Sequence, residues 1–356
     1  MDYTVEITLT CDIELTNRCN ATCHFCPRDA TPHQGIMTPE IFDQSLARAI
    51  EFGATAREQL GIELAVSLCG LGEPLLNRNA VTFVRKVREA GLPCIMSSNA
   101  ALLDAEKGRA LLDAGLQKIC INVADEGEAY TQVYNLPFQK TRDNIVRFAE
   151  VARDRCDVSL VIVNHRRDLS HVEQMKDYWR AQGINQFIQY EVVNRAGSLF
   201  VDHMRFETYP ELAQARAMLD ASEEHPICGA PFVYLFIGWD GQYYLCCSDW
   251  KKEVPLGSVF DTSFLAVTRK KMLHVLHREP ICKRCNHDPL NRLTEQLRSV
   301  EKGEAAPGGT DALLAHMRES SEAVRSVLSK VGEAAAAELP FDPPHTEASI
   351  FAATAK

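Results

Sequence analysis

Residues 11–27 read CDIELTNRCNATCHFCP, an apolar segment followed at once by three cysteines. The spacing Cys19-x-x-x-Cys23-x-x-Cys26 allows one loop to bring three thiolates to a common centre. Three protein ligands leave one position of a [4Fe–4S] cluster open, so one iron there is free to bind a further molecule. A zinc loop, or structural cysteines with no metal, is the alternative that the spacing alone leaves open.

Apolar runs and helical patterns alternate after this segment. The first helix is predicted to begin with Thr38 as N-cap and Pro39 as its first residue, and to end near Gly53. Repeated strand and helix units with short connections predict an α/β fold with a parallel sheet, either open or curled toward a barrel. Reactive groups are then expected at the carboxyl ends of the strands. The six predicted strands are residues 11–16, 62–68, 93–97, 117–123, 157–163 and 186–192.

A second set of cysteines follows residues 205–222, which predict one connecting helix. An apolar run ends in Trp239-Asp240-Gly241-Gln242, where the Asp-Gly pair predicts a hairpin turn. Strand neighbours face opposite sides, so only one of Cys246 and Cys247 can reach a common centre. Two pairs of cysteines beside a hairpin also describe a zinc site with four cysteine ligands. The set consists of Cys228, Cys246, Cys247, Cys282 and Cys285.

The overall composition excludes several functional classes. A formal net charge of −10 without a basic run argues against nucleic-acid binding, which depends on clustered Lys and Arg. We find neither an N-terminal targeting pattern nor an apolar run of membrane-spanning length, so we expect a cytoplasmic protein without a membrane partner. In a reducing compartment, 13 cysteines favour metal or cluster ligation over disulfides.

The first cysteine motif, with Phe25 before its third cysteine, resembles the signature of the radical S-adenosylmethionine (SAM) superfamily. Cys69-Gly70-Leu71-Gly72-Glu73-Pro74, at the end of the second strand, resembles the family's Gly-Gly-Glu motif, and the similarity extends over residues 11 to 200. The resemblance implies a partial (βα)6 barrel in which Cys19, Cys23 and Cys26 hold a [4Fe–4S] cluster and SAM chelates the open iron. The SAM-binding residues that it implies are Phe25, Gly70, Gly72, Glu73, Ser97, Asn99 and Asn122.

The spacing of Cys228, Gly241 and Cys246 resembles the auxiliary-cluster motif of the SPASM and twitch subfamilies. No cysteine follows Cys285, which points to the shorter twitch domain with one auxiliary [4Fe–4S] cluster held by Cys228, Cys246, Cys282 and Cys285. The expected organisation is a barrel over residues 1–200, a linker helix over 201–227, a twitch domain over 228–290, and a helical tail over 291–356. The end of that tail, including Pro340, Pro343 and Pro344, is expected to be poorly ordered.

The resemblance implies that the reduced cluster splits SAM and that the resulting 5′-deoxyadenosyl radical abstracts hydrogen from a polar small molecule. A barrel with one fully ligated twitch cluster is most similar to aminocyclitol dehydrogenases of the butirosin type. We therefore expect oxidation of a sugar or aminocyclitol alcohol in antibiotic biosynthesis, with flavodoxin or ferredoxin as external electron donor. Alternatives are an epimerase, a peptide-modifying enzyme and a non-catalytic cluster scaffold. The epimerase would use a cysteine hydrogen donor, for which the candidates are Cys120, Cys69 and Cys247.

Overall fold

The computed structural model describes residues 9–199, 205–221, 226–304 and 308–338. Its central feature is a sheet whose first six strands are parallel and lie in the order β6-β5-β4-β3-β2-β1. The prediction of six βα units is confirmed, with strand ends shifted by at most three residues. The strands are β1 (Leu9–Ile13), β2 (Leu64–Leu68), β3 (Cys94–Ser98), β4 (Lys118–Asn122), β5 (Asp157–Asn164) and β6 (Phe187–Glu191).

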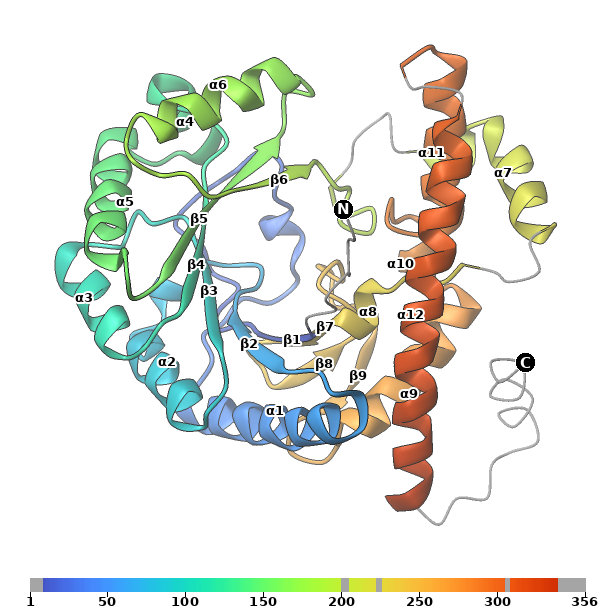
Figure 1. Ribbon diagram of the computed structural model, residues 1–356, viewed down its shortest axis with the longest axis horizontal. Helices are drawn as coiled ribbons and strands as arrows, with labels where there is room; N and C mark the ends of the chain where they lie inside the picture. The colour runs from blue at the N-terminus through green and yellow to red at the C-terminus, as the bar shows by residue number, and fades with distance from the viewer. Residues whose placement is uncertain (1–8, 200–204, 222–225, 305–307, 339–356) are drawn as a thin grey trace.

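Six helices cover the convex outer side of this curved sheet (Figure 1). Strand side chains that face them, such as Cys11, Val66 and Ile119, are fully buried and belong to one continuous core. Alternate residues of the same strands therefore face the concave inner side. The covering helices are α1 (Pro39–Leu60), α2 (Ala80–Glu89), α3 (Ala105–Asp113), α4 (Gly127–Tyr134), α5 (Phe138–Ala152) and α6 (Leu169–Arg180).

Helix α1 begins as predicted but ends later. The Thr38 hydroxyl caps it by accepting a bond from Ile41 N at 3.3 Å, and Pro39 is its first residue. The predicted end at Gly53 is wrong, because the helix continues to Leu60 and Gly61, with a φ of 65°, closes it. An added Cβ at Gly53 would lie 3.5 Å from the Leu64 side chain, so this glycine lies where α1 packs on β2.

The sheet continues beyond the six parallel strands. Strand β7 (Tyr234–Ile237) pairs in parallel with β1, and β8 (Gln242–Tyr244) and β9 (Pro255–Ser258) add in antiparallel fashion. The predicted hairpin turn is confirmed, with Gly241 at a φ of 75°. We expected a small β unit after the barrel, but one nine-stranded sheet runs through both parts because β7 covers the free edge of β1.

The remaining helices gather on the open side of the curved sheet, where α12 runs along it (Figure 1). The single connecting helix predicted over 205–222 is shorter in the structure. Tyr209 precedes Pro210 and is extended, with a φ of −88° and a ψ of 125°, so the helix begins only afterwards. The predicted disordered end of the tail lies outside the described residues. These helices are α7 (Glu211–Asp220), α8 (Ala230–Val233), α9 (Phe264–His277), α10 (Pro280–Lys283), α11 (Pro289–Glu301) and α12 (Gly309–Glu338).

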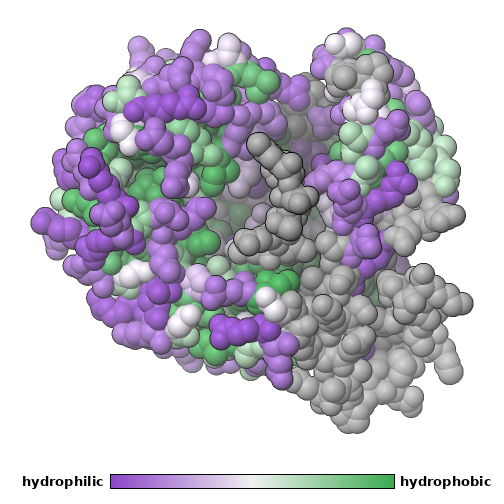
Figure 2. Space-filling view, viewed as in Figure 1, coloured by the Kyte–Doolittle hydropathy of each residue, from purple (hydrophilic) through white to green (hydrophobic). Residues whose placement is uncertain are grey.

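Figure 2 shows mainly hydrophilic side chains on the outer surface, with apolar residues visible between them. In the part of the chain that the structure describes, every helix is too short or too polar to cross a membrane.

Candidate functional site

The loop that carries the first cysteine set is braced by its own side chains. The Arg28 guanidinium donates to the carbonyl oxygens of Cys19 and Ala21 at 2.9 and 2.8 Å. Asn17 closes the base of the loop, because its amide donates to His33 O at 2.6 Å and accepts from Gly35 N at 2.8 Å. The three cysteines therefore lie on a loop of defined shape at the carboxyl end of β1.

Gly72 brings the loop after β2 directly against the cysteine loop. A Cβ at this position would lie 2.3 Å from Arg18 O and 2.5 Å from Thr16 O, both backbone atoms. The neighbouring Glu73 N donates to Arg18 O at 2.9 Å. Only glycine allows this approach, which explains one glycine of the predicted SAM-binding motif in structural terms. Gly70 is similarly close to the Glu14 side chain.

The Glu73 carboxylate is fully buried and is bonded within the protein. Its Oε1 accepts from Ser98 Oγ at 2.8 Å, and its Oε2 accepts from Asn99 N at 2.7 Å. Burial raises the pKa of Glu73, and the hydrogen bond from Asn99 N opposes this. The Asn99 amide in turn donates to Asn20 Oδ1 at 2.8 Å and lies 3.7 Å from Cys19 Sγ. Glu73 thus positions Asn99 beside the first cysteine set, a role that the motif alone did not indicate.

Ser97 and Asn122 were predicted as SAM contacts, and Asn122 Nδ2 donates to Ser97 Oγ at 3.3 Å. Both side chains are half-buried on the inner face, where Asn122 shares strand parity with Cys120. The predicted inward position of Cys120 agrees with the burial pattern of β4, in which Ile119 and Ile121 are buried on the other face. Ser98, the middle residue of the predicted polar strand end Ser97-Ser98-Asn99, bonds to Glu73 instead, because neighbouring strand residues face opposite sides.

The second cysteine set is spread over three segments: Cys228 precedes α8, Cys246 and Cys247 follow β8, and Cys282 and Cys285 lie within and just after α10. The Asn291 amide donates to the carbonyl oxygens of Cys282, Lys283 and Cys285, at 3.4, 3.0 and 2.7 Å. His287 N lies 3.4 Å from Cys285 Sγ and donates to it. Such N–H donors to sulfur are typical of iron–sulfur sites.

The cysteines of both sets are unpaired thiols. Burial raises the pKa of Cys23 to about 12, and the charges of Cys26 and Cys19 add to this effect. Burial likewise raises the pKa of Cys282 to about 12, with further contributions from Asp288 and Cys285. Members of each set are therefore close enough to interact electrostatically.

Both sets offer only sulfur ligands, which suit an iron–sulfur cluster and also suit zinc. Among the described residues, the ligand atoms of Asp125, His165 and His171 form a group whose members lie within 4.8 Å of one another.

Between the two cysteine sets, the inner face of the sheet carries a polar group that sequence reasoning missed. Asp12 of β1 pairs in register with Ser67 of β2, and the Ser67 hydroxyl lies 3.1 Å from Cys69 Sγ. Burial raises the pKa of Asp12 to about 7, against hydrogen bonds with Thr10, Cys69 and Ser67. The charge of the buried Lys271 also lowers the pKa of Asp12, although no ion pair within 4.0 Å joins the two described side chains. Strand parity predicts that Asp12 faces inward, but it does not predict these neighbours.

The same interior is open to solvent. Tyr190 of β6 is 55% exposed and Tyr234 of β7 is 41% exposed. Burial raises the pKa of Tyr234 to about 12, and the nearby Tyr190 adds to this. Burial raises the pKa of Cys247 to about 11, with a contribution from Asp12, so this thiol also adjoins the interior. Cys69 and Cys247, two of the predicted hydrogen donors, are thereby brought to one place.

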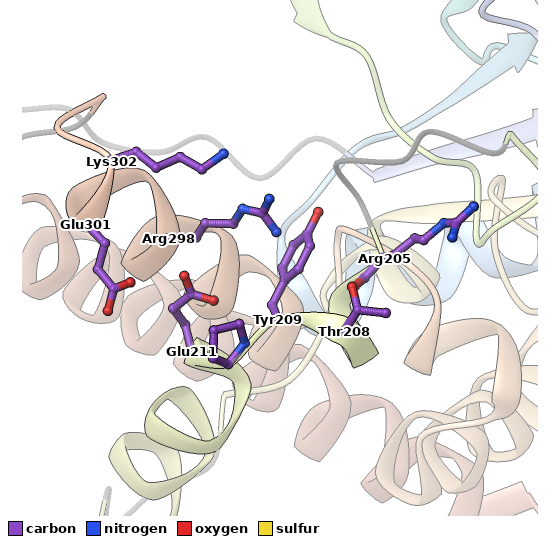
Figure 3. A pocket seen from close by; sticks show the side chains of 8 residues that line it. Arg205, Thr208, Tyr209, Glu211, Arg298, Glu301 and Lys302 are labelled. Carbon is purple, nitrogen blue, oxygen red and sulfur yellow. The ribbon is translucent and has the colours of Figure 1, made fainter.

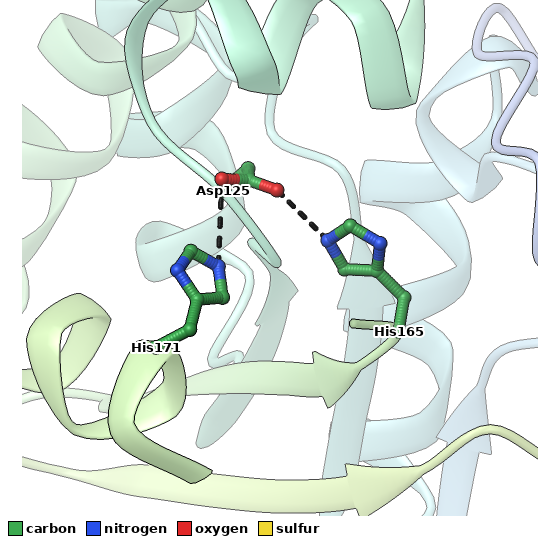
Figure 4. A group of neighbouring side chains, drawn as sticks. All are labelled: Asp125, His165 and His171. Atoms are coloured by element: carbon green, nitrogen blue, oxygen red, sulfur yellow. Dashed lines mark hydrogen bonds and ion pairs between the residues drawn. The ribbon is translucent and has the colours of Figure 1, made fainter. Parts of the chain in front are cut away.

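A further polar cluster lies at the ends of β4 and β5 (Figure 4). Asp125 accepts from His165 Nε2 at 2.8 Å and from Arg166 Nη2 at 2.6 Å, and His171 Nε2 lies 3.4 Å away. The His165 ring centre is 5.7 Å from that of Phe25. The Asp125 carboxylate is already paired with Arg166. The group of Asp125, His165 and His171 is therefore an ion-pair network beside the cysteine loop rather than a metal site. In the sequence, this cluster could have been predicted from Asp125 and His165, polar residues that come just after β4 and β5.

A surface pocket of about 780 Å³ lies between α7 and α11 and includes Tyr209, Glu211 and Arg298 (Figure 3). The Arg298 guanidinium lies 3.7 Å from the centre of the Tyr209 ring. None of the predicted cofactor residues lines this pocket.

Comparison with known families agrees with both cysteine sites. Residues 13–178 match the radical SAM superfamily, and residues 228–286 match the iron–sulfur cluster-binding SPASM domain. The chain carries a radical SAM domain followed by a SPASM domain. Its fold, a parallel α/β sheet with a C-terminal SPASM region, is the one expected from the cysteine motifs.

Among curated relatives of this radical SAM protein, the GTP 3′,8-cyclase of Synechococcus sp. (strain CC9605) is 34% identical over 35% of this chain and 36% of its own length. The probable GTP 3′,8-cyclase of Metallosphaera sedula is 27% identical over 60% and 66%. The first of these matches spans only about a third of the relative's length.

Solved structures share the fold at low identity. BtrN in complex with AdoMet and 2-DOIA matches with a TM-score of 0.52 and 16% identity, over 80% of this chain and 94% of BtrN. Streptococcus suis SuiB bound to precursor peptide SuiA matches with a TM-score of 0.54 and 12% identity, over 81% and 73%.

Proposed function

We propose that this chain is a radical SAM enzyme with two [4Fe–4S] clusters that oxidises a polar small molecule. Seven free thiols carry the proposal, three of them within the residues that match the radical SAM family and four within those that match the SPASM domain. Cys19, Cys23 and Cys26 hold the SAM-binding cluster. The auxiliary cluster is held by Cys228, Cys246, Cys282 and Cys285.

When bound, the first cluster and SAM supply one-electron reductive cleavage that produces a 5′-deoxyadenosyl radical. The chain's own residues orient the reactants around this chemistry. Asn99, fixed by Glu73, and the aromatic ring of Phe25 hold SAM beside the cysteine loop. The polar inner face, which includes Asp12 and Asn122, binds the substrate.

The first candidate reaction is oxidation of an alcohol of a sugar or aminocyclitol. Loss of a hydrogen atom, a proton and an electron converts a secondary alcohol to a ketone. Asp12, whose pKa burial raises to about 7, can accept the hydroxyl proton. Cys228, Cys246, Cys282 and Cys285 would leave no iron of an auxiliary [4Fe–4S] cluster open, so a cluster bound there would be available to accept the electron, with flavodoxin or ferredoxin as the external reductant of the first cluster.

Epimerisation is a second candidate, favoured by the position of Cys69. Burial holds the pKa of Cys69 well above its usual range, and the charge of Asp12 adds to this. The thiol is therefore protonated and can return a hydrogen atom to a carbon radical. The thiyl radical left behind would be restored by one electron, for which the auxiliary cluster would be the donor, and one proton from solvent. Cys120 and Cys247, on the same inner face, are the other candidate donors.

The relatives suggest two further substrate classes. The curated relatives are named for GTP, which makes GTP a substrate to be tested, and SuiB is bound to a precursor peptide, which makes peptides another.

The test uses anaerobically reconstituted protein, dithionite as reductant and SAM, with 5′-deoxyadenosine measured by mass spectrometry. We expect 5′-deoxyadenosine from the wild type and none from a Cys19→Ala, Cys23→Ala, Cys26→Ala variant. A wild-type protein that carries its iron but forms no 5′-deoxyadenosine contradicts the proposal.

Once a substrate turns over, product mass in deuterated water separates the two reactions. A loss of about two mass units supports the dehydrogenase, and a gain of about one supports epimerisation through a thiol that exchanges with solvent.

A further inference from the structure

Glu14, the first residue after β1, carries a fully buried carboxylate that bonds to two distant parts of the chain. Its Oε1 accepts a hydrogen bond from Leu71 N at 3.0 Å, in the loop after β2. Its Oε2 accepts from Trp239 N at 3.2 Å and from Lys252 Nζ at 3.3 Å, both within the SPASM region, residues 228–286. One carboxyl group therefore joins the loop after β2 to the SPASM region.

The Lys252 side chain is enclosed by groups that stabilise its charge. It is only 9% exposed, and its ammonium lies 4.5 Å from the centre of the Phe236 ring and 4.1 Å from that of Tyr244. Its backbone has a φ of 59°, which is disfavoured for residues with a Cβ and persists only where the surrounding structure holds the segment. These contacts fix the ammonium against Glu14.

The loop that carries Lys252 begins at the second cysteine set. Asp249 N donates to Cys246 O at 3.1 Å, and Lys252 N donates to Asp249 O at 3.2 Å. The buried Asp249 carboxylate accepts from Glu253 N at 2.8 Å and from Val254 N at 2.9 Å. The segment from Cys246 to Val254 is therefore compact, and the position of Lys252 depends on that of Cys246.

On the other side of Glu14, the contacts reach the two loops that the proposed function assigns to SAM. A Cβ at Gly70 would lie 2.6 Å from Glu14 Cγ, so the loop after β2 packs directly on this side chain. Trp239 packs in the same way on Gly35, at the base of the cysteine loop, where a Cβ would lie 2.2 Å from its ring. The SPASM region thus contacts both loops, one of them through Glu14.

Removal of the Lys252 charge is expected to change the loop after β2. A buried carboxylate without its cation is costly, so it becomes protonated, takes up water or moves. In each case the acceptor that holds Leu71 N is altered. The effect would reach this loop from a residue 238 positions beyond Glu14 in the sequence.

We infer that Lys252 is a positioning residue for SAM, which acts through Glu14 to hold the loop after β2 in the shape that binds SAM. The SPASM region then determines the affinity of the SAM site. The inference rests on the proposed function, which places SAM beside the cysteine loop. It goes beyond that function, because electron transfer to an auxiliary cluster requires no such contact.

The test measures the SAM affinity of reconstituted holoenzyme by anaerobic calorimetry, with iron per chain determined for each variant. Lys252→Met removes the charge but keeps an unbranched side chain that packs well on aromatic rings. Lys251→Met is the matched control, because Lys251 is the exposed neighbour. We expect about tenfold weaker SAM binding in Lys252→Met and wild-type affinity in Lys251→Met. Wild-type affinity in an iron-replete Lys252→Met protein overturns the inference, even if that variant unfolds at a lower urea concentration.

A second measurement uses the wild type alone and decides the matter if Lys252→Met does not hold its iron. Coupling between two sites is reciprocal, so SAM should in turn stabilise the loop that carries Lys252. Amide hydrogen exchange, followed by mass spectrometry, should slow on addition of SAM both in the loop after β2 and in residues 246–254. Slower exchange after β2 with no change over 246–254 overturns the inference.

Failure of the proposed function gives a different result, because the wild type would then cleave no SAM. A wild type that cleaves SAM, together with unchanged SAM affinity in Lys252→Met, refutes the coupling alone.

Discussion

Asp12 is a buried carboxyl group with no lysine, arginine or histidine within 4.0 Å in the described part of the chain. Burial raises its pKa from 3.8 to about 7, and hydrogen bonds with Thr10, Cys69 and Ser67 only partly oppose this. A carboxyl with a raised folded-state pKa stabilises the protein when protonated, and this contribution is lost as the pH rises through about 7.

Asp12→Asn should therefore become more stable relative to the wild type as the pH rises. Between pH 5 and pH 8 we expect a relative gain of about 3 kcal/mol, because Asn cannot acquire the buried charge. Anaerobic urea titrations at the two pH values measure it. A difference that is independent of pH would show that Asp12 titrates normally.

Glu73→Gln should destabilise the protein by about 2–3 kcal/mol, because the amide NH₂ of glutamine would face one of the groups that now donate a hydrogen bond to the carboxylate. Those donors are Ser98 Oγ and the backbone N–H groups of Leu75 and Asn99. Urea unfolding at pH 7 provides the measurement, with the exposed Glu63→Gln as control. Equal stability of the two variants would show that the network contributes little.

Cysteine spacing predicted both cysteine sites, because short motifs keep their residues near one another whatever the rest of the fold does. Asp12 and Lys252 carry no such local signal. Their environments depend on strand register and on contact with Glu14, 238 residues away from Lys252 along the chain. The position of Glu73 was predicted, but its bonds to Ser98 and Asn99 depend on β3 lying beside β2.

At the scale of elements, the loop after β2 and the cysteine loop make contact through Gly72. Gly72→Ala would place a Cβ 2.3 Å from Arg18 O, and backbone on both sides cannot move cheaply. We expect the variant to lose about four irons per chain, because the first cluster would no longer be held.

Iron and sulfide analysis after reconstitution measures this loss. Gly53→Ala is the matched control, since its Cβ meets Leu64 at an ordinary 3.5 Å and lies within a helix. If Gly72→Ala kept the iron content of the wild type, the close contact between the two loops would not be needed to hold the first cluster.

The elements show why helix ends were harder to predict than strands. Alternating burial marks a strand over its whole length, but a glycine marks a helix end only if its φ is positive. Gly61 has a φ of 65°, and Gly53 lies inside α1. The sequence does not distinguish these two glycines, because the packing of α1 against β2 decides which of them ends the helix.

At the scale of the whole molecule, one sheet runs from the residues that match the radical SAM family into those that match the SPASM domain through the pairing of β1 with β7. This arrangement could not be predicted from the hairpin signal, since pairing with β1 depends on a strand edge more than 200 residues away. The continuous sheet places both cysteine sets around a common interior.

The central claim is that seven thiolates hold about eight irons, so that one iron lacks a protein ligand and binds SAM. Mössbauer spectroscopy of ⁵⁷Fe-reconstituted protein, with and without SAM, tests this most directly. We predict that about one eighth of the iron signal shifts on addition of SAM, while the rest is unchanged. A spectrum that SAM does not alter, or iron absent from sites that hold zinc, would contradict the account.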